Sequence, residues 1–222
     1  MDFIAQAAAI GKQVDGPVKI IWTREEDVQH DMYRPAFYDR MAAGLDAQGL
    51  PVAWSHRICG SSIIARWAPP VFKNGYDPDT IDGALELPYS FPNVRLEYVQ
   101  NEPKGIQTAF WRSVGPSHNI FVVESFIDEL AAAAKKDPVE YRRALLDKSP
   151  RAKAVLDLAA EKSGWGQPLP KGSGRGVSIG EAPGGMGEPG TCAVPPAITN
   201  AIFAATGVRL RKLPIDTSKL KA

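Results

Sequence analysis

The feature that most constrains the fold is a helical pattern between Ser117 and Asp137. Apolar side chains recur there every three or four positions, the spacing that places them on one face of an α-helix. They are Ile120, Val123, Phe126, Ile127 and Leu130. The pattern ends at Asp137-Pro138, because proline cannot continue a helix. It predicts a core helix, with Phe126 among its buried residues.

Four further segments carry helical patterns. They are residues 2–10, 139–147, 151–163 and 197–205. Pro195-Pro196 leads into the last of these and Gly207 ends it, as expected for the two ends of a helix. Apolar residues such as Leu156 and Ile198 should face inward.

Four runs are typical of β-strands: residues 18–22, 37–45, 52–58 and 94–99. The connection at 46–51 contains glycine and suits a hairpin. Between the last two runs, the proline-rich segment 68–92 should be mostly loop. Helices packed on such strands predict an α+β fold with β-hairpins and an antiparallel or mixed sheet.

The charges of the chain nearly cancel. Lys and Arg number 26 against 25 Asp and Glu, which leaves a net charge of +1. Such a balance provides no extended positive field for nucleic acid. All apolar runs are far shorter than the ~20 residues that cross a bilayer. We therefore expect no nucleic-acid partner and no membrane span. No signal peptide is visible, so a cytoplasmic and a periplasmic location both stay open.

The residues that usually bind metals are few and scattered. Cys59 and Cys192 are too few for a disulfide framework or for a Cys-rich zinc or iron–sulfur site. His30, His56 and His118 lack the spacing of zinc or iron ligands. We therefore expect no protein-ligated metal and structural roles for the histidines.

The segment 180–190 is the most unusual in composition, with five glycines in eleven residues and the two carboxylates of Glu181 and Glu188. It lacks the Lys and Ser or Thr of a phosphate-binding loop. A carboxylate in a tight, poorly solvated loop has a raised pKa, which suits a general base. The alternative is a solvated turn.

Two arginines lie beside aromatic residues and turns. Arg34, in Tyr33-Arg34-Pro35, could stabilise developing negative charge or pin a substrate carbonyl; the alternative is that it stacks on Tyr33 and bonds to Glu25, Glu26 or Asp31. Arg112 precedes the core helix, whose first N–H groups could help it to bind an anion. The alternative for Arg112 is a salt bridge to Glu124 or Asp128, with Phe110-Trp111 packed under the loop.

Taken in order, four motifs and their surroundings resemble one family. They are Trp22-Thr23-Arg24-Glu25-Glu26-Asp27, Tyr33-Arg34-Pro35-Ala36, Arg112-Ser113-Val114-Gly115-Pro116-Ser117-His118-Asn119 and Gly187-Glu188-Pro189-Gly190. The family is the molybdopterin-binding large subunit of the xanthine oxidase group of molybdenum hydroxylases, in the branch of the isoquinoline 1-oxidoreductase beta subunit. The resemblance covers most of the chain.

The resemblance implies roles for individual residues. Glu188 stands where the family has its catalytic base, and Arg34 where an arginine steadies the substrate. Arg112 and Gly187 stand where the family contacts its cofactor. That cofactor is molybdopterin, in its cytosine dinucleotide form for this branch.

The resemblance also implies the reaction and its partners. The substrate would be an aldehyde or an N-heteroaromatic compound, hydroxylated at carbon with oxygen from water. Electrons would pass to a small subunit that carries iron–sulfur clusters. Complete members of the family are several times longer, so the chain resembles a fragment or an internally deleted form. We therefore expect little or no molybdenum in the isolated chain.

The expected domain organisation follows the same resemblance. Residues 1–166 would form a partial molybdopterin-binding domain, 167–179 a linker, and 180–222 the active-site loop and helix of the same domain. The alternative is a catalytically silent fragment, or a scaffold that binds a partner subunit without cofactor.

Overall fold

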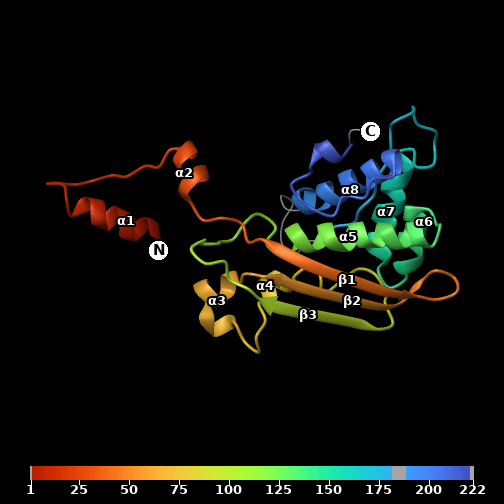
Figure 1. Ribbon diagram of the computed structural model, residues 1–222, viewed down its shortest axis with the longest axis horizontal. Coiled ribbons are helices and arrows are strands. Elements are labelled where there is room, and N and C mark those ends of the chain that lie inside the picture. Colours follow the sequence, from red (N-terminus) through yellow and green to blue (C-terminus); the bar gives the residue numbers. More distant parts are fainter. Residues whose placement is uncertain (1, 182–188, 221–222) are drawn as a thin grey trace. The chain divides into compact units, whose positions relative to one another are not determined.

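The computed structural model describes residues 2–181 and 189–220 (Figure 1). The chain forms two compact units, residues 1–33 and 34–222. The first unit contains helices α1 (Asp2–Gly11) and α2 (Arg24–His30). Side chains 3–10 of α1 are all exposed, so this helix, although predicted, buries no apolar face within its unit.

The start of α2 is capped as its sequence predicts. Thr23 Oγ1 accepts a hydrogen bond from the Glu26 N–H at 3.2 Å, and the Glu26 carboxylate accepts one from the Thr23 N–H at 3.2 Å. The strand expected at 18–22 is wrong. The described residues of this unit form no strand, and residues 18–22 have no neighbouring strand with which their backbone N–H and C=O groups could pair.

The second unit is built on a three-stranded mixed sheet of β1 (Phe37–Leu45), β2 (Pro51–Gly60) and β3 (Val94–Gln100). β1 and β2 form the predicted antiparallel hairpin. At its turn the Asp46 carboxylate accepts hydrogen bonds from the N–H groups of Gln48 and Leu50. β3 runs parallel to β2. Parallel pairing needs a long connection, which residues 61–93 provide.

The helices of the second unit lie largely on one face of the sheet (Figure 1). They are α3 (Ile63–Trp67), α4 (Pro78–Ile81), α5 (Pro116–Ala133), α6 (Pro138–Leu145), α7 (Pro150–Lys162) and α8 (Pro189–Thr206), with 3₁₀ turns at Pro69–Val71 and Thr217–Leu220. α5 lies along the sheet, and α8 packs on the side of α5 away from it. The predicted α+β class is confirmed. None of the helices in the described part of the chain could span a membrane.

α8 departs from its sequence prediction. It begins at Pro189 and contains Pro195 and Pro196, whereas the prolines were expected to precede it. Each proline removes the hydrogen bond to the residue four positions earlier and crowds the carbonyl of that residue, and packing along α5 offsets this cost and keeps the helix continuous. Ile198, expected to face inward, is exposed.

The core forms where α5 meets the sheet and helices α6 and α7. Val123, Ile127 and Leu130 of α5 are buried, as the helical pattern predicts. Trp54 of β2 stacks on Phe91, with ring centroids 4.6 Å apart. Phe126 is only half-buried, at the edge of the core. Its ring meets Trp54 edge-on, so it marks the border of the apolar stripe.

A buried group of charges lies beside this core. Arg142 of α6 and Glu124 of α5 are both within 1% of complete burial, and Arg142 Nε donates to Glu124 Oε2 at 2.9 Å. Asp128 lies 3.7 Å from Arg142 and accepts a hydrogen bond from Arg209 at 2.8 Å. Tyr89 donates to the second Glu124 oxygen at 2.6 Å. The charges are thus paired and hydrogen-bonded, which burial requires.

Two glycines, Gly174 and Gly176, allow residues 174–176 to lie directly on α8. A Cβ at Gly174 would come within 2.4 Å of the Ala201 carbonyl oxygen, and one at Gly176 within 2.0 Å of that of Ala197. Neither position admits a side chain, so residues 174–176 contact the helix backbone itself.

We predict that Arg142→Met destabilises the chain by about 3–5 kcal/mol, because it leaves the buried carboxylate of Glu124 without its cation, while Asp128 keeps its ion pair with Arg209. The control is Arg143→Met. Arg143 pairs with Glu140 and Asp157 at the surface, where an ion pair contributes about 0–1 kcal/mol. Urea denaturation measures both free energies of unfolding. Similar losses in the two variants would contradict the assigned role of the buried pair.

We predict that Ile127→Ala costs about 2–5 kcal/mol, because its side chain is completely buried. Phe126→Ala should cost less, about 1–2 kcal/mol, because part of the ring already faces solvent. Urea denaturation of both variants checks the order. A larger loss for Phe126→Ala would show that the ring belongs to the core after all.

Candidate functional site

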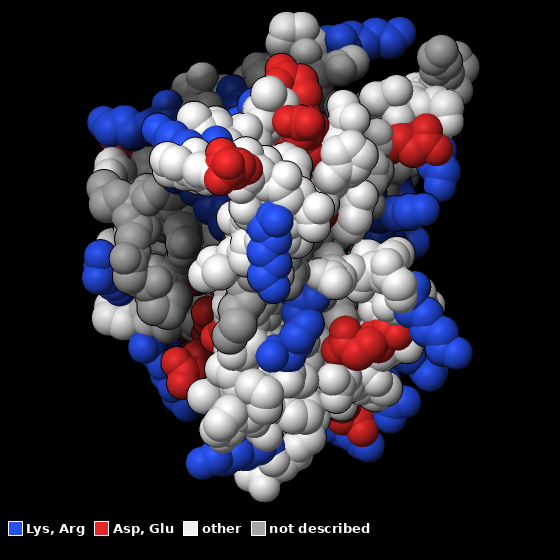
Figure 2. All heavy atoms as spheres, turned by 90° about the vertical axis from the view of Figure 1, so that its left-hand side faces the viewer, with Lys and Arg blue, Asp and Glu red and all other residues white. Residues whose placement is uncertain are grey.

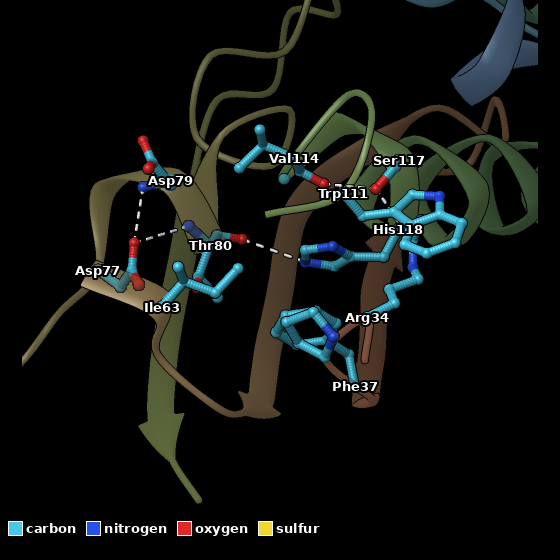
Figure 3. Close-up of a pocket in the computed structure, with 12 residues that line it drawn as sticks. Arg34, Phe37, Ile63, Asp77, Asp79, Thr80, Trp111, Val114, Ser117 and His118 are labelled. Carbon is cyan, nitrogen blue, oxygen red and sulfur yellow. Dashed lines mark hydrogen bonds between the residues drawn. The ribbon is translucent and has the colours of Figure 1, made fainter. Parts of the chain in front are cut away.

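A small pocket lies where α5 begins, between the end of the sheet and the segment around α4 (Figure 3). Its cavity measures about 20 Å³, room for one or two water molecules. The residues that decide its chemistry are Arg34, Phe37, Thr80, Trp111, Ser117 and His118. The described residues therefore form a wall with a shallow recess.

The loop before α5 has an unusual backbone. Ser113 and Val114 have φ values of 67° and 34°, in the left-handed region that residues with a Cβ rarely adopt. Gly115 then packs so closely on the α4 segment that a Cβ would come within 2.1 Å of the Asp79 carbonyl oxygen. Asn119 fixes the same contact, because its Nδ2 donates to the carbonyls of Thr80 and Asp82 at 2.7 and 2.8 Å. The start of α5 is thus held rigidly at the pocket.

Arg34 extends into this pocket, as Figure 3 shows. Its guanidinium donates a hydrogen bond to Ser117 Oγ, and the Ser117 hydroxyl donates to the Val114 carbonyl. Burial lowers the pKa of Arg34, yet an arginine stays protonated at any physiological pH. A partly desolvated positive charge is therefore fixed in the pocket wall.

His118 lies beside Arg34 and is uncharged. Its ring stacks on Phe37 with centroids 3.6 Å apart, and Nε2 lies 3.2 Å from the Thr80 carbonyl oxygen. Burial, assisted by the charge of Arg34, lowers the pKa of His118 to about 3. The imidazole is therefore neutral near pH 7 and contributes shape and hydrogen bonding without a charge. His56 is also buried, with Nε2 2.8 Å from Asp39 Oδ1.

The carboxylates near the pocket have structural roles. Asp77 is completely buried and accepts hydrogen bonds from Ser62 Oγ and from the N–H groups of Ile64, Asp79 and Thr80. It therefore caps α4 and ties it to α3. Burial and the neighbouring carboxylates Asp77 and Asp82 raise the pKa of Asp79. Within the described part of the chain, no cluster of three or more His, Cys, Asp or Glu side chains could hold a metal ion.

Of the two candidate arginines, the structure places only Arg34 in the lining of the pocket. Arg34 lines the pocket, and Trp111, next to Arg112, does too. Arg112 is exposed and has no hydrogen bond or ion pair with any described residue. The alternative salt bridges of Arg112 are wrong, because Glu124 and Asp128 are bound by other arginines of the core.

Other candidates lie apart from the pocket or cannot be placed. Phe110 and Trp111 are about half exposed, so they are not packed under the loop as the alternative supposed. Glu181 is exposed. Glu188 and Gly187 lie outside the described residues.

The sequence did not identify two residues that shape the site. Ser117 lies inside the quoted motif but has no charge to draw attention, and its role depends on a residue 83 positions away. Asp77 could have been found from Asp77-Pro78, because an aspartate before proline is a frequent helix cap. Its burial and its bonds to α3 depend on tertiary packing.

Acidic and basic side chains are interspersed over the face that Figure 2 presents. That face therefore has no single sign of charge that would attract a charged ligand, whereas Arg34 gives the pocket wall a fixed positive charge.

Comparison with known proteins gives consistent matches. Isoquinoline 1-oxidoreductase subunit beta of Brevundimonas diminuta is 31% identical over 183 residues, 81% of this chain and 23% of that protein. A membrane-bound aldehyde dehydrogenase (pyrroloquinoline-quinone) of Gluconacetobacter polyoxogenes is 29% identical over 200 residues, 80% of this chain and 26% of that protein. The chain thus spans about a quarter of the length of these relatives.

A solved structure agrees on the fold. The aldehyde oxidoreductase of Desulfovibrio gigas aligns with 71% of this chain and 19% of its own, with a TM-score of 0.52 and 17% identity. The model of the molybdopterin cofactor-binding domain family matches residues 1–146. This match covers more than half of the sequence and confirms the resemblance drawn from the motifs. The chain therefore belongs to the molybdopterin cofactor-binding domain family.

Proposed function

We propose that this chain forms one wall of the molybdopterin site in the large subunit of a molybdenum hydroxylase. The observation that carries the proposal is the fixed guanidinium of Arg34 at the start of α5, in a chain that matches the molybdopterin cofactor-binding family. A desolvated cation in a rigid wall suits a substrate that gains negative charge as it reacts. The resemblance of the surrounding motif assigns the same role to Arg34.

The residues present fit one face of such a cofactor. Arg112 is an exposed cation with no partner among the described residues, and Trp111 beside it offers an exposed indole. A guanidinium pairs well with a phosphate, and an indole stacks on a heteroaromatic ring. The recess of about 20 Å³ is too small to enclose a pterin, so further walls are needed.

The reaction assigned by analogy is RH + H₂O → ROH + 2 e⁻ + 2 H⁺. When bound, the molybdenum pterin supplies oxygen transfer and accepts the electrons. Arg34 orients the substrate and stabilises negative charge on it, and the neutral His118 beside it adds shape and hydrogen bonding without a second charge. Glu188 accepts a proton at its carboxylate as the attacking oxygen forms its bond to carbon. Gly187 stands at the position where the family contacts its cofactor, and a glycine there has no side chain to obstruct such a contact.

The finer assignments rest on relatives and motifs. The names of the relatives favour an aldehyde or an N-heteroaromatic substrate. One relative is named for pyrroloquinoline quinone, but the family match over residues 1–146 favours molybdopterin. We assign the cytosine dinucleotide form and an iron–sulfur small subunit as partner, because the chain most resembles the branch that uses both.

We predict that the 222-residue chain, produced in cells that make the cofactor, contains well below one molybdenum per chain. Its described residues provide a wall and not a closed site, so a bound cofactor would be lost during purification. Metal analysis by mass spectrometry, with extraction of the pterin, measures this. About one molybdenum and one pterin per chain would contradict the expectation.

We predict that Glu188→Gln, in an enzyme that contains this segment, lowers kcat by about 10²–10⁴, because glutamine keeps the size of the side chain but cannot accept the proton. Glu181→Gln is the matched control, seven positions away and exposed, and should change kcat far less. Molybdenum content must be equal in both variants. A larger loss for Glu181→Gln would show that the base had been assigned to the wrong residue, and an unchanged kcat in both variants would show that neither carboxylate acts as the base.

A further inference from the structure

A second and larger cavity lies between β1, α5 and the segment that follows α8. It measures about 220 Å³, and we call it the β1–α5 cavity. Its main lining residues are Asp39, Met41, Phe121, Ser125, Phe126 and Arg211. It shares no lining residue with the pocket at the start of α5. It is therefore a separate candidate site.

One side of the β1–α5 cavity is apolar, whereas Asp39, Ser125, Glu129 and Arg211 supply polar groups to the rest. On the apolar side, Phe121 and Phe126 come from successive turns of α5, and Met41 faces them from β1. A wholly apolar cavity of about 150 Å³ binds benzene in other proteins. The β1–α5 cavity is larger, so a single aromatic ring with a short substituent fits by volume.

The cavity also contains a buried carboxylate with an unused oxygen. The Asp39 side chain is 7% exposed, and its Oδ1 lies 2.8 Å from His56 Nε2. No described residue donates a hydrogen bond to its Oδ2. Oδ2 is not one of the fully buried polar atoms that lack a partner, so solvent in the cavity reaches it and a ligand could donate a hydrogen bond to it there.

His56 contacts only one oxygen of that carboxylate. Its Nε2 lies 2.8 Å from Oδ1, whereas its Nδ1 is buried and has no hydrogen-bond partner among the described residues. A second N–H on the ring would therefore have no acceptor. Asp39 Oδ2 is left without a bond from His56.

The other polar groups of the cavity do not compensate the charge of the Asp39 carboxylate. Arg211 forms two hydrogen bonds with the Glu129 carboxylate, at 2.7 and 2.8 Å, so the two rim charges cancel. Ser125 Oγ is buried without a partner in the described structure and is neutral. The net charge of the cavity is therefore negative and comes from Asp39.

From these contacts we propose that the β1–α5 cavity binds a small arylalkylamine in its ammonium form. The ring lies against Phe121, Phe126 and Met41, and the ammonium group donates to Asp39 Oδ2. This binding does not depend on the molybdenum function.

The test titrates the full 222-residue chain, labelled with ¹³C at the methionine methyl groups, with benzylamine at pH 7. Met41 lines the cavity, so its methyl signal should shift and saturate, while those of the other three methionines in the sequence stay unchanged. We expect a dissociation constant of about 1 mM or tighter, reasonable for a ligand of this size. Absence of a saturable Met41 shift would overturn the proposal.

Two ligands of the same shape test the role of charge. Benzyl alcohol keeps the ring and one donor without the charge, and benzoate reverses the charge. Benzylamine should bind at least tenfold more tightly than benzyl alcohol, and benzoate should bind more weakly than either. Equal or tighter binding of benzoate would contradict the assignment. This series uses the unaltered protein, so it decides the question even if a variant fails to fold.

Asp39→Asn should weaken benzylamine binding at least tenfold and leave the affinity for benzyl alcohol within threefold, because asparagine keeps the acceptor for His56 and loses the charge. Glu161→Gln, on the exposed surface of α7 and outside the cavity lining, is the matched control and should change the affinity for benzylamine less than threefold. If Asp39→Asn binds benzylamine as tightly as the unaltered chain, the ammonium does not contact Asp39 and the proposal is wrong.

Discussion

The second unit depends on the ion pair between Glu124 and Arg142 more than on any other single contact. Arg142 donates to both the side chain and the backbone carbonyl of Glu124, which ties α6 to the middle of α5. The same carboxylate accepts from the backbone N–H of Ile179 at 2.9 Å and so fixes the segment that leads into the Gly-rich loop. Because these groups are buried, each is stable only while the others are present. Helices that are distant in sequence thus fold as one body.

Much of the fold could be predicted because it follows from local patterns. The spacing of Val123, Ile127 and Leu130 is sufficient to predict α5 and its buried face, and alternation predicts the β1–β2 hairpin. The strand expected at 18–22 failed because a strand needs a neighbour, which a local pattern cannot reveal. The predicted start of α8 was wrong because its two internal prolines suggested the beginning of a helix. Packing on α5, which the local sequence does not show, extends the helix to Pro189.

The candidate site could be predicted only in part. Arg34 and Arg112 were found from their neighbours in sequence and from the resemblance of their motifs. The contact of Arg34 with Ser117, and the neutral state of His118, arise from residues brought together by folding. The β1–α5 cavity had no signal in the sequence, because Asp39 in a strand with alternating exposure reads as an ordinary surface residue. Its burial beside His56 depends on the packing of α5 over the sheet.

The contact between residues 174–176 and α8 limits how this part of the molecule can vary. Gly174 and Gly176, with one residue between them, both contact the backbone of α8 so closely that neither position could carry a side chain. Inserting a single residue between the two glycines would bring a side chain to one of the two contacts with α8. Insertions and deletions within residues 174–176 should therefore destabilise the fold. Lengthening should be tolerated upstream, at Gly172, where a Cβ would meet no atom within 4 Å. Across homologous sequences, length differences should therefore accumulate before residue 174 and stop abruptly there.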